Sequence, residues 1–172
     1  MLKQGRTVEP AAKSRLDGDD LRGRFASATA LLVRNVVAVN ALNVFPVPDG
    51  DTGTNMFLTL RAVVESAEPL PGASATEVAE AMARGALMGA RGNSGVILSQ
   101  FFKGIAAGLE GACEFGAEEM ATAYRKARDY SYGAVGEPVE GTMLTVIGSV
   151  ADAAEGVVDA SGGVQELAEA VL

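Results

Sequence analysis

The chain has 172 residues, 48% of them hydrophobic, and its 14 Lys and Arg against 22 Asp and Glu give a formal net charge of −8. This length is enough for one domain that folds without disulfides or a structural metal. The acidic balance argues against nucleic acid as a partner, because affinity for phosphate backbones comes from clustered Lys and Arg. With no histidine and one cysteine, Cys113, the chain cannot form a Ser-His-Asp or Cys-His site, an internal disulfide or a cysteine-rich zinc site.

The N-terminal residues do not have the pattern of a targeting or membrane segment. No apolar run reaches the about 18 residues that a membrane span needs, and residues 1–16 lack the apolar stretch of a signal peptide. We therefore predict a cytoplasmic protein without a membrane span. Residues 1–16 carry few large apolar side chains, which indicates a disordered leader before a folded domain over residues 17–172.

Apolar residues at helical spacing predict a first helix that begins near Asp17, with Asp19 or Asp20 as its cap. The helix must end before Pro46, because proline cannot donate the helical hydrogen bond and restricts its predecessor. Its expected inward face consists of Leu21, Phe25, Ala28, Leu32, Val36 and Val39.

Further helices follow the first one. Met56 to Ala67 forms a second amphipathic pattern, which the Pro69-Leu70-Pro71-Gly72 stretch ends. Ser74 and Glu77 have the spacing of a capping box and open a third helix. After a break at Gly89, Gly92 and Gly95, helices are predicted over 96–109, 117–130, 143–158 and 163–172. Alternating strand patterns are absent from the sequence, so the predicted fold class is all-α.

The first polar loop, Asn43 to Asn55, reads NVFPVPDGDTGTN. Asp49 and Asp51, two residues apart in a loop with two prolines and two glycines, can both turn onto one hard cation. Mg²⁺ binds few carboxylates and takes its other ligands from phosphate and water, so the pair suits it. The alternative is a plain Asp-Gly turn with solvated carboxylates.

The second loop, Gly89 to Gly95, reads GARGNSG and precedes an apolar helix. Glycines allow a ligand close to the backbone, and a helix N-terminus offers free amides to an anion. Arg91 is placed to pair with a phosphate oxygen. The glycine spacing is neither a Walker A motif nor a dinucleotide fingerprint. Tight helix packing with an Asn or Ser cap is the alternative.

The third loop, Glu140-Gly141-Thr142-Met143, also precedes an apolar helix. Alone it is an ordinary cap. Three flexible polar loops that each lead into a helix can, however, line one end of a helical bundle and surround a triphosphate. That combination favours a nucleotide site over three separate caps.

These segments resemble the L-subunit family of dihydroxyacetone kinases, and within it the N-terminal kinase domain of bacterial fatty acid kinases. The resemblance rests on NALNVFPVPDGDTGTNM from Asn40, GARGNSGVILSQ from Gly89 and PVEGTMLTV from Pro138. It spans about residues 16–172. It implies an antiparallel α-helical barrel or bundle of about eight helices, with Mg-ATP held by the loops at one end. Because that barrel continues further, the resemblance also implies that the domain is truncated at its C-terminus.

Carried over by position, the resemblance implies that Asp49 and Asp51 bind Mg²⁺. Glycerone kinases have a third aspartate upstream of this pair, and Asn43 is its nearest match in this chain, although it lies one residue further from the pair. Arg91 as a neutraliser of transition-state charge is inferred from its position alone. The expected nucleotide contacts are Thr52, Thr54, Asn55, Asn93, Ser94, Thr142 and Met143.

The implied reaction transfers the γ-phosphoryl group of ATP to the carboxylate of a fatty acid held by a separate binding protein, giving an acyl phosphate. Thr52 replaces the histidine that glycerone kinases usually have after the second aspartate, which favours the fatty acid kinases. A dihydroxyacetone kinase-type subunit and a non-catalytic nucleotide-binding module are the alternatives. The acyl-carrying partner, and any homodimer, are expected to use parts of the family that lie outside these residues. Inactivity of the isolated fragment is therefore an open alternative.

Overall fold

The computed structural model describes residues 13–44 and 47–171. Within these ranges the chain forms seven helices and no strand ladder: α1 (Gly18–Ala41), α2 (Thr52–Ala67), α3 (Ala75–Gly89), α4 (Gly92–Gly108), α5 (Ala117–Gly133), α6 (Met143–Asp159) and α7 (Val164–Ala170). The all-helical prediction is confirmed, whereas a closed barrel of about eight helices remains an expectation. Most of the predicted leader, residues 1–12, lies outside the described ranges, as do residues 45–46 of the first polar loop.

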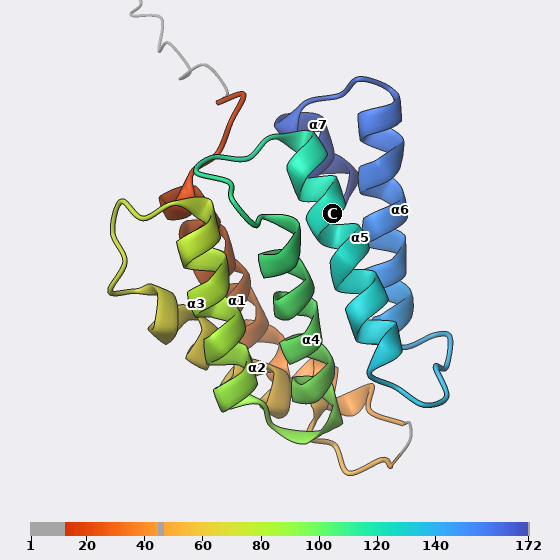
Figure 1. The fold of residues 1–172 in the computed structure, drawn as a ribbon. Helices are drawn as coiled ribbons and strands as arrows, with labels where there is room; N and C mark the ends of the chain where they lie inside the picture. The colour runs from red at the N-terminus through yellow and green to blue at the C-terminus, as the bar shows by residue number, and fades with distance from the viewer. Residues whose placement is uncertain (1–12, 45–46, 172) are drawn as a thin grey trace, which may run out of the picture.

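The helices run up and down, and each packs against its neighbour in sequence (Figure 1). In addition, α1 packs on α3 and α2 packs on α4. Alternate connections of such a bundle lie at the same end. The connections α1–α2, α3–α4 and α5–α6 therefore share one end, which is the lower end in Figure 1. No helix in the described ranges is long and apolar enough to cross a membrane.

The core is centred on Phe102 of α4, which is 1% exposed. Its ring lies 4.9 Å from that of Phe25 in α1 and 5.5 Å from that of Phe101, between ring centroids. Such tilted and edge-to-face contacts add to the hydrophobic contribution of the buried rings. Around them pack apolar side chains from most of the helices, the largest being Leu21, Val63, Val78, Met82, Ile105, Leu109 and Phe115.

The predicted inward face of α1 is less buried than its periodicity indicates. Leu21 is buried and Val36 is half-buried, but Ala28 is exposed. On other faces of the helix Val37 is 82% exposed, and Leu42 just beyond it is 77% exposed. The apolar spacing therefore indicated the helix correctly but overestimated how much of it joins the core.

The helix ends differ from prediction at two places. The cap of α1 is Asp17, whose carboxylate accepts the Asp20 amide while the Asp20 side chain accepts the Asp17 amide, so neither Asp19 nor Asp20 is the N-cap. Gly92 and Gly95 lie inside α4 rather than interrupting the helical pattern. The capping box of Ser74 and Glu77 is confirmed. A reciprocal box satisfies two amides at once, which explains why α1 begins one turn earlier than at Asp20.

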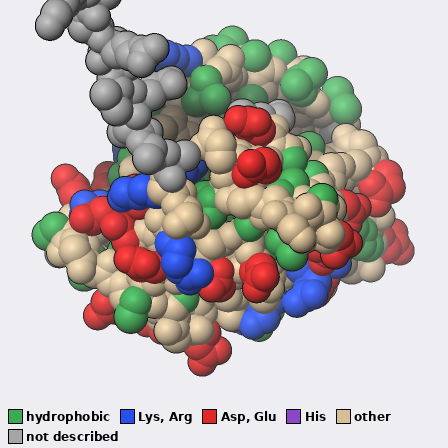
Figure 2. Space-filling view, turned by 90° about the horizontal axis from the view of Figure 1, so that it is seen from above, with side chains coloured by type: hydrophobic (Ala, Val, Ile, Leu, Met, Phe, Trp, Pro, Cys, Tyr) green, Lys and Arg blue, Asp and Glu red, His purple; other side chains and the backbone are tan. Residues whose placement is uncertain are grey.

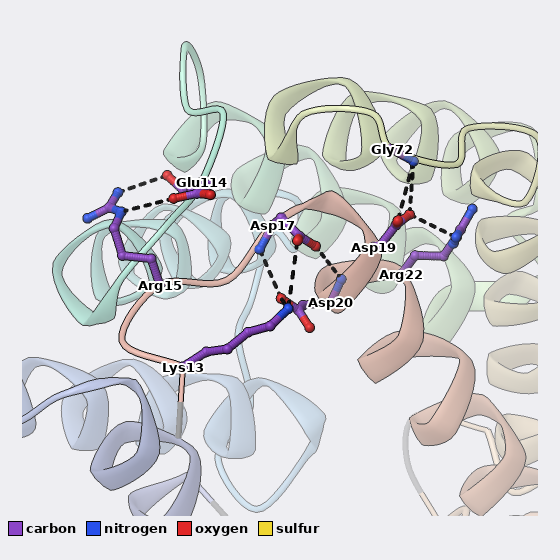
Figure 3. Close-up of polar contacts among 8 residues, drawn as sticks. All are labelled: Lys13, Arg15, Asp17, Asp19, Asp20, Arg22, Gly72 and Glu114. Carbon is purple, nitrogen blue, oxygen red and sulfur yellow. Dashed lines mark hydrogen bonds and ion pairs between the residues drawn. The ribbon is translucent and has the colours of Figure 1, made fainter. Parts of the chain in front are cut away.

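Residues 13–16 are fastened to the end of the bundle opposite the polar loops. Leu16 is buried and exchanges two backbone hydrogen bonds of 2.8 Å with Phe115. Arg15 donates to the Glu114 carbonyl at 2.9 Å and pairs with Glu119 at 2.8 Å; the close-up of this end in Figure 3 draws the contact with Glu114. Acidic and basic side chains are interspersed over this end (Figure 2). The described part of the predicted leader is therefore tied to the α4–α5 connection.

Helices α4 and α5 approach each other closely at two glycines. A Cβ added to Gly104 would lie 2.3 Å from the Ala127 Cα, and one added to Gly108 would lie 2.2 Å from the Ala123 Cα. Both neighbours are backbone atoms, which cannot rotate away as a side chain can. The small residues thus set the distance between the two helices.

Gly104→Ala should destabilise the domain by about 1–3 kcal/mol, because the added methyl forces the α4 and α5 backbones apart. Gly156→Ala is the matched control. That glycine is also helical but has no neighbour within 4 Å, so alanine there should stabilise by about 0.5–1 kcal/mol. Urea denaturation of both variants measures the difference. Equal effects of the two substitutions would contradict close α4–α5 packing.

Acid should release residues 13–16. Hydrogen bonding by Arg15 lowers the pKa of Glu119, and hydrogen bonding by Lys13 lowers the pKa of Asp20. A carboxyl group with a lowered folded-state pKa stabilises the fold above its unfolded pKa and loses this effect as pH falls through the folded-state pKa. Hydrogen exchange at the Leu16 amide should therefore accelerate below about pH 4 relative to core amides. The Glu119→Gln variant should show a smaller acid response at that amide.

Candidate functional site

The α1–α2 and α3–α4 connections meet at the lower end of the bundle (Figure 1). The Ser94 hydroxyl, in the first turn of α4, donates to the Thr52 carbonyl, in the first turn of α2, at 3.5 Å. Gly92 lies against the Asn55 side chain so closely that an added Cβ would be 2.4 Å from the Asn55 Nδ2. The N-termini of α2 and α4 are therefore side by side, and the positive ends of both helix dipoles lie in one place.

Two asparagines from the end of α1 hydrogen-bond to the start of α2. Asn43 Oδ1 accepts from the Thr52 amide at 3.2 Å and from the Thr52 hydroxyl at 2.6 Å, while its Nδ2 donates to the Val47 carbonyl at 2.8 Å. Asn40 Oδ1 accepts from the Thr54 amide, and its Nδ2 donates to the Thr54 hydroxyl, both at 3.1 Å. The threonines that the resemblance assigns to phosphate contact thus have partners within the protein.

Asp49 and Asp51 are both exposed. Neither carboxylate makes a hydrogen bond or an ion pair with any described residue, although Asp51 occupies the N-cap position of α2. The described ranges contain no group of three or more His, Cys, Asp or Glu side chains able to hold a metal. Two free carboxylates beside a helix N-terminus fit Mg²⁺, because this ion takes only one or two carboxylates and completes its shell with phosphate and water oxygens.

The start of α4 presents backbone amides. Gly92 has φ +57, a left-handed conformation that favours glycine. The Arg91 amide donates to the Thr59 hydroxyl at 3.3 Å, and the Gly95 amide to the Arg91 carbonyl at 2.9 Å. Between them, the amides of residues 92–94 have no partner within the described part of the chain. Free amides at a helix N-terminus are the kind of group that can bind an anion.

The predicted residues of the second loop differ in burial. Asn93 is exposed beside the free amides, whereas Ser94 is buried and directed at α2. Arg91 is exposed, and its guanidinium donates to the Ala90 carbonyl at 2.9 Å. It lines a groove of about 410 Å³ between α2 and α3, together with Arg61. The Arg91 side chain therefore lies at the margin of the two joined loops.

The third predicted loop lies at the same end of the bundle but is not joined to the other two by any described hydrogen bond. Glu140 accepts from the Thr145 hydroxyl at 2.6 Å and from the Tyr132 hydroxyl at 3.4 Å. The Thr142 hydroxyl donates to the Val139 carbonyl and accepts from the Leu144 amide, so it caps α6. Met143 is half-buried. The structure thus brings together two of the three loops and leaves Thr142 in a capping role.

Asn40 and Thr59 were not among the predicted site residues. Thr59 is fully buried in α2; its hydroxyl donates to the Asn55 carbonyl at 2.8 Å and accepts from the Arg91 amide. It therefore attaches the α3–α4 turn to α2. A threonine between the apolar residues Leu58 and Leu60 has no pattern that distinguishes this role. Asn40 stands in the conspicuous NALN segment, but only the fold shows that it reaches Thr54.

Comparison with known proteins identifies the family. The model of the DAK2 domain matches residues 46–172, about three quarters of the chain. The chain belongs to the DAK2 domain family. Among relatives, protein YloV of Bacillus subtilis is 47% identical over 131 residues, which are 76% of this chain and 24% of YloV. An uncharacterised protein of Staphylococcus haemolyticus is 43% identical over 141 residues, which are 82% of this chain and 26% of that protein.

DAK2 domains are kinase-related, so membership makes the chain a phosphotransfer-type domain at this coarse level. The family match begins within the first polar loop and includes the N-termini of α2, α4 and α6. The chain spans about a quarter of the length of the curated relatives that it matches.

Thr59→Val should loosen the α3–α4 turn, because valine has nearly the same shape but leaves the Arg91 amide without its acceptor. The expected loss of stability is about 1 kcal/mol. Thr29→Val is the control, since that hydroxyl bonds only the carbonyl of Phe25 in its own helix. Amide exchange should accelerate at Arg91 in the first variant alone. An unchanged Arg91 amide would show that the turn is held by other contacts.

Proposed function

We propose that this DAK2 domain is an ATP- and Mg²⁺-dependent phosphotransferase whose acceptor is the carboxylate of a fatty acid held by a separate binding protein. The observation that carries the proposal is the contact between the first turns of α2 and α4, where Ser94 donates to the Thr52 carbonyl and Gly92 lies against Asn55. This contact puts the loop that carries Asp49 and Asp51 next to α4, whose first amides have no partner among the described residues. The carboxylates suit a metal ion and the amides suit a phosphate. Mg-ATP combines both partners in one ligand.

In this proposal Asp49 and Asp51 hold Mg²⁺, which neutralises charge on the phosphate oxygens. The amides of residues 92–94 and the Asn93 side chain bind the β- and γ-phosphates. Phosphoryl transfer depends mainly on positioning and charge neutralisation, which a metal and helix N-termini supply. The metal ion and the helix N-terminal amides are needed to attract the nucleotide, because the chain as a whole has a net charge of −8 and repels anions.

The other residues proposed to contact the nucleotide differ in how close they lie to the start of α4. Asn55 lies against Gly92, where its side chain is next to the free amides. Thr52 and Thr54 border the same space, but their hydroxyls are engaged with asparagines. Thr142 and Met143 approach the nucleotide only if it extends toward the third loop. Arg91 reaches the transferred phosphoryl group only if its side chain turns away from the Ala90 carbonyl.

A carboxylate acceptor is compatible with a chain that has no histidine. A carboxylic acid with a pKa of about 4 to 5 is ionised at neutral pH, so no general base is needed. A carboxylate oxygen attacks the γ-phosphorus, the bond to the bridging oxygen breaks, and ADP leaves as the acyl phosphate forms. The binding protein would supply the lipid site.

The family membership alone also permits a dihydroxyacetone kinase-type subunit. Thr52, which stands where glycerone kinases usually have histidine, counts against this second candidate. The two differ in their product. Hydroxylamine traps an acyl phosphate as a hydroxamate but does not react with a phosphate monoester, so the trapped product identifies the acceptor when ATP and a fatty-acid-loaded binding protein are supplied.

Calorimetric titration should show that ATP binds the chain in the presence of Mg²⁺ and at least tenfold more weakly without it, a difference of about 1.4 kcal/mol or more. Asp49→Asn and Asp51→Asn should remove the effect of Mg²⁺ while leaving the fold intact by circular dichroism. Asp159→Asn, an exposed carboxylate at the C-terminal end of α6, is the matched control. Binding that is equal with and without the metal would contradict the proposed role of the first loop.

A further inference from the structure

The first turn of α2 lies close to the last turns of α1. A Cβ added to Gly53 would be 2.6 Å from the Val36 carbonyl oxygen and 3.0 Å from the Asn40 Oδ1. Only glycine permits this approach of one backbone to another. It brings the asparagines at the end of α1 within hydrogen-bond distance of the first amides of α2.

We propose that Asn40, in the last turn of α1, and Asn43, just beyond that helix, are positioning residues. They cap α2 and so leave the carboxylates of Asp49 and Asp51 for the metal. Asn43, the predicted third ligand, then does not bind the metal itself. This inference rests on the proposed function, because it assigns these residues a role toward the Mg²⁺ of that site.

The hydrogen bonds of Asn43 occupy both lone pairs of its amide oxygen. An amide oxygen has two lone pairs, and Asn43 Oδ1 accepts two hydrogen bonds from Thr52. The donation of Nδ2 to the Val47 carbonyl fixes which way the amide group faces. Direct coordination of a metal by this oxygen would require breaking at least one bond to Thr52.

Asp51 occupies the N-cap position of α2 but does not cap the helix. An N-cap aspartate usually adopts an extended backbone and accepts the amide of the second or third helical residue. Asp51 instead has φ −115 and ψ −2 and makes no capping bond. The amide of the third helical residue, Thr54, is taken by Asn40 Oδ1. A neutral side chain from α1 therefore does the capping, and the charged oxygens of Asp51 are not consumed by their own helix.

The first test uses the metal-free chain. Asn40→Ala should accelerate amide exchange at Thr54, and Asn43→Ala at Thr52, each about fivefold, because each amide loses its acceptor. Asn40→Asp should largely restore protection at Thr54, since a carboxylate also accepts that bond. Asn35→Ala is the control, because Asn35 lies on the same helix and bonds only the Leu31 carbonyl. If both amides exchange as in the wild type, the positioning role is wrong.

The second test measures metal affinity by titration with Mn²⁺ in the presence of ATP. Asn40→Ala should weaken Mn²⁺ binding about fivefold, because Asp51 is then free to cap Thr54 and loses that oxygen for the metal. Asn40→Asp, which keeps an acceptor for the Thr54 amide, should hold the Mn²⁺ affinity within twofold of the wild type. Equal weakening by Asn40→Ala and Asn40→Asp would overturn the proposed action of Asn40 through Asp51.

The two tests together separate this inference from the function on which it rests. Loss of Mn²⁺ binding in Asn43→Ala with an unchanged Thr52 amide in the metal-free chain would make Asn43 a ligand and overturn the inference. A wild-type chain that binds neither Mn²⁺ nor Mg-ATP would instead refute the proposed function, and with it the metal-directed role of both asparagines, whatever the exchange rates show.

Discussion

The approach of α2 to α1 at Gly53 is the constraint on which the candidate site depends. A Cβ on Gly53 would be only 2.6 Å from the Val36 carbonyl oxygen, so a side chain there would push the two backbones apart. At this distance Asn40 of α1 and Asn43, just after α1, reach the first amides of α2. The capping of α2 is thereby transferred to α1. The loop between the helices is held at both ends, with the carboxylates of Asp49 and Asp51 on its exposed side.

The second constraint is the alternation of the bundle. Because consecutive helices are antiparallel, every second connection returns to the same end, and the positive ends of α2, α4 and α6 face the same way. Thr59 and Ser94 then join the first two of these connections directly. The two helix N-termini differ in which backbone amides are already hydrogen-bonded. The amides of Thr52 and Thr54 in α2 donate to asparagines, whereas those of residues 92–94 in α4 have no partner in the described part of the chain and can bind an anion. Glycines allow close backbone contact both between α4 and α5, at Gly104 and Gly108, and between α2 and α1 at the site, at Gly53.

Most of the fold could be predicted from the sequence, because amphipathic spacing, proline positions and the Ser74 capping box are local signals. The cap at Asp17 was missed because several aspartates compete there, and only the reciprocal bond with Asp20 decides among them. The exposure of Ala28, on the predicted inward face, was missed because periodicity indicates a face but not what covers it. At the site, the polar loops were predictable from composition. The partners of Asn43 and the role of Thr59 were not, because they depend on contacts between α1, α2 and the α3–α4 turn.

The central claim is that a metal-bound nucleotide lies between the first loop and the start of α4. Paramagnetic broadening of backbone amide signals by Mn-ATP tests it most directly, since the effect falls steeply with distance from the metal. If the nucleotide binds there, the signals of residues 49–52 and 92–94 should broaden first. Those of the α4–α5 connection around Phe115, at the opposite end of the bundle, should stay sharp. Broadening centred on any other part of the molecule, with residues 49–52 unaffected, would contradict the account.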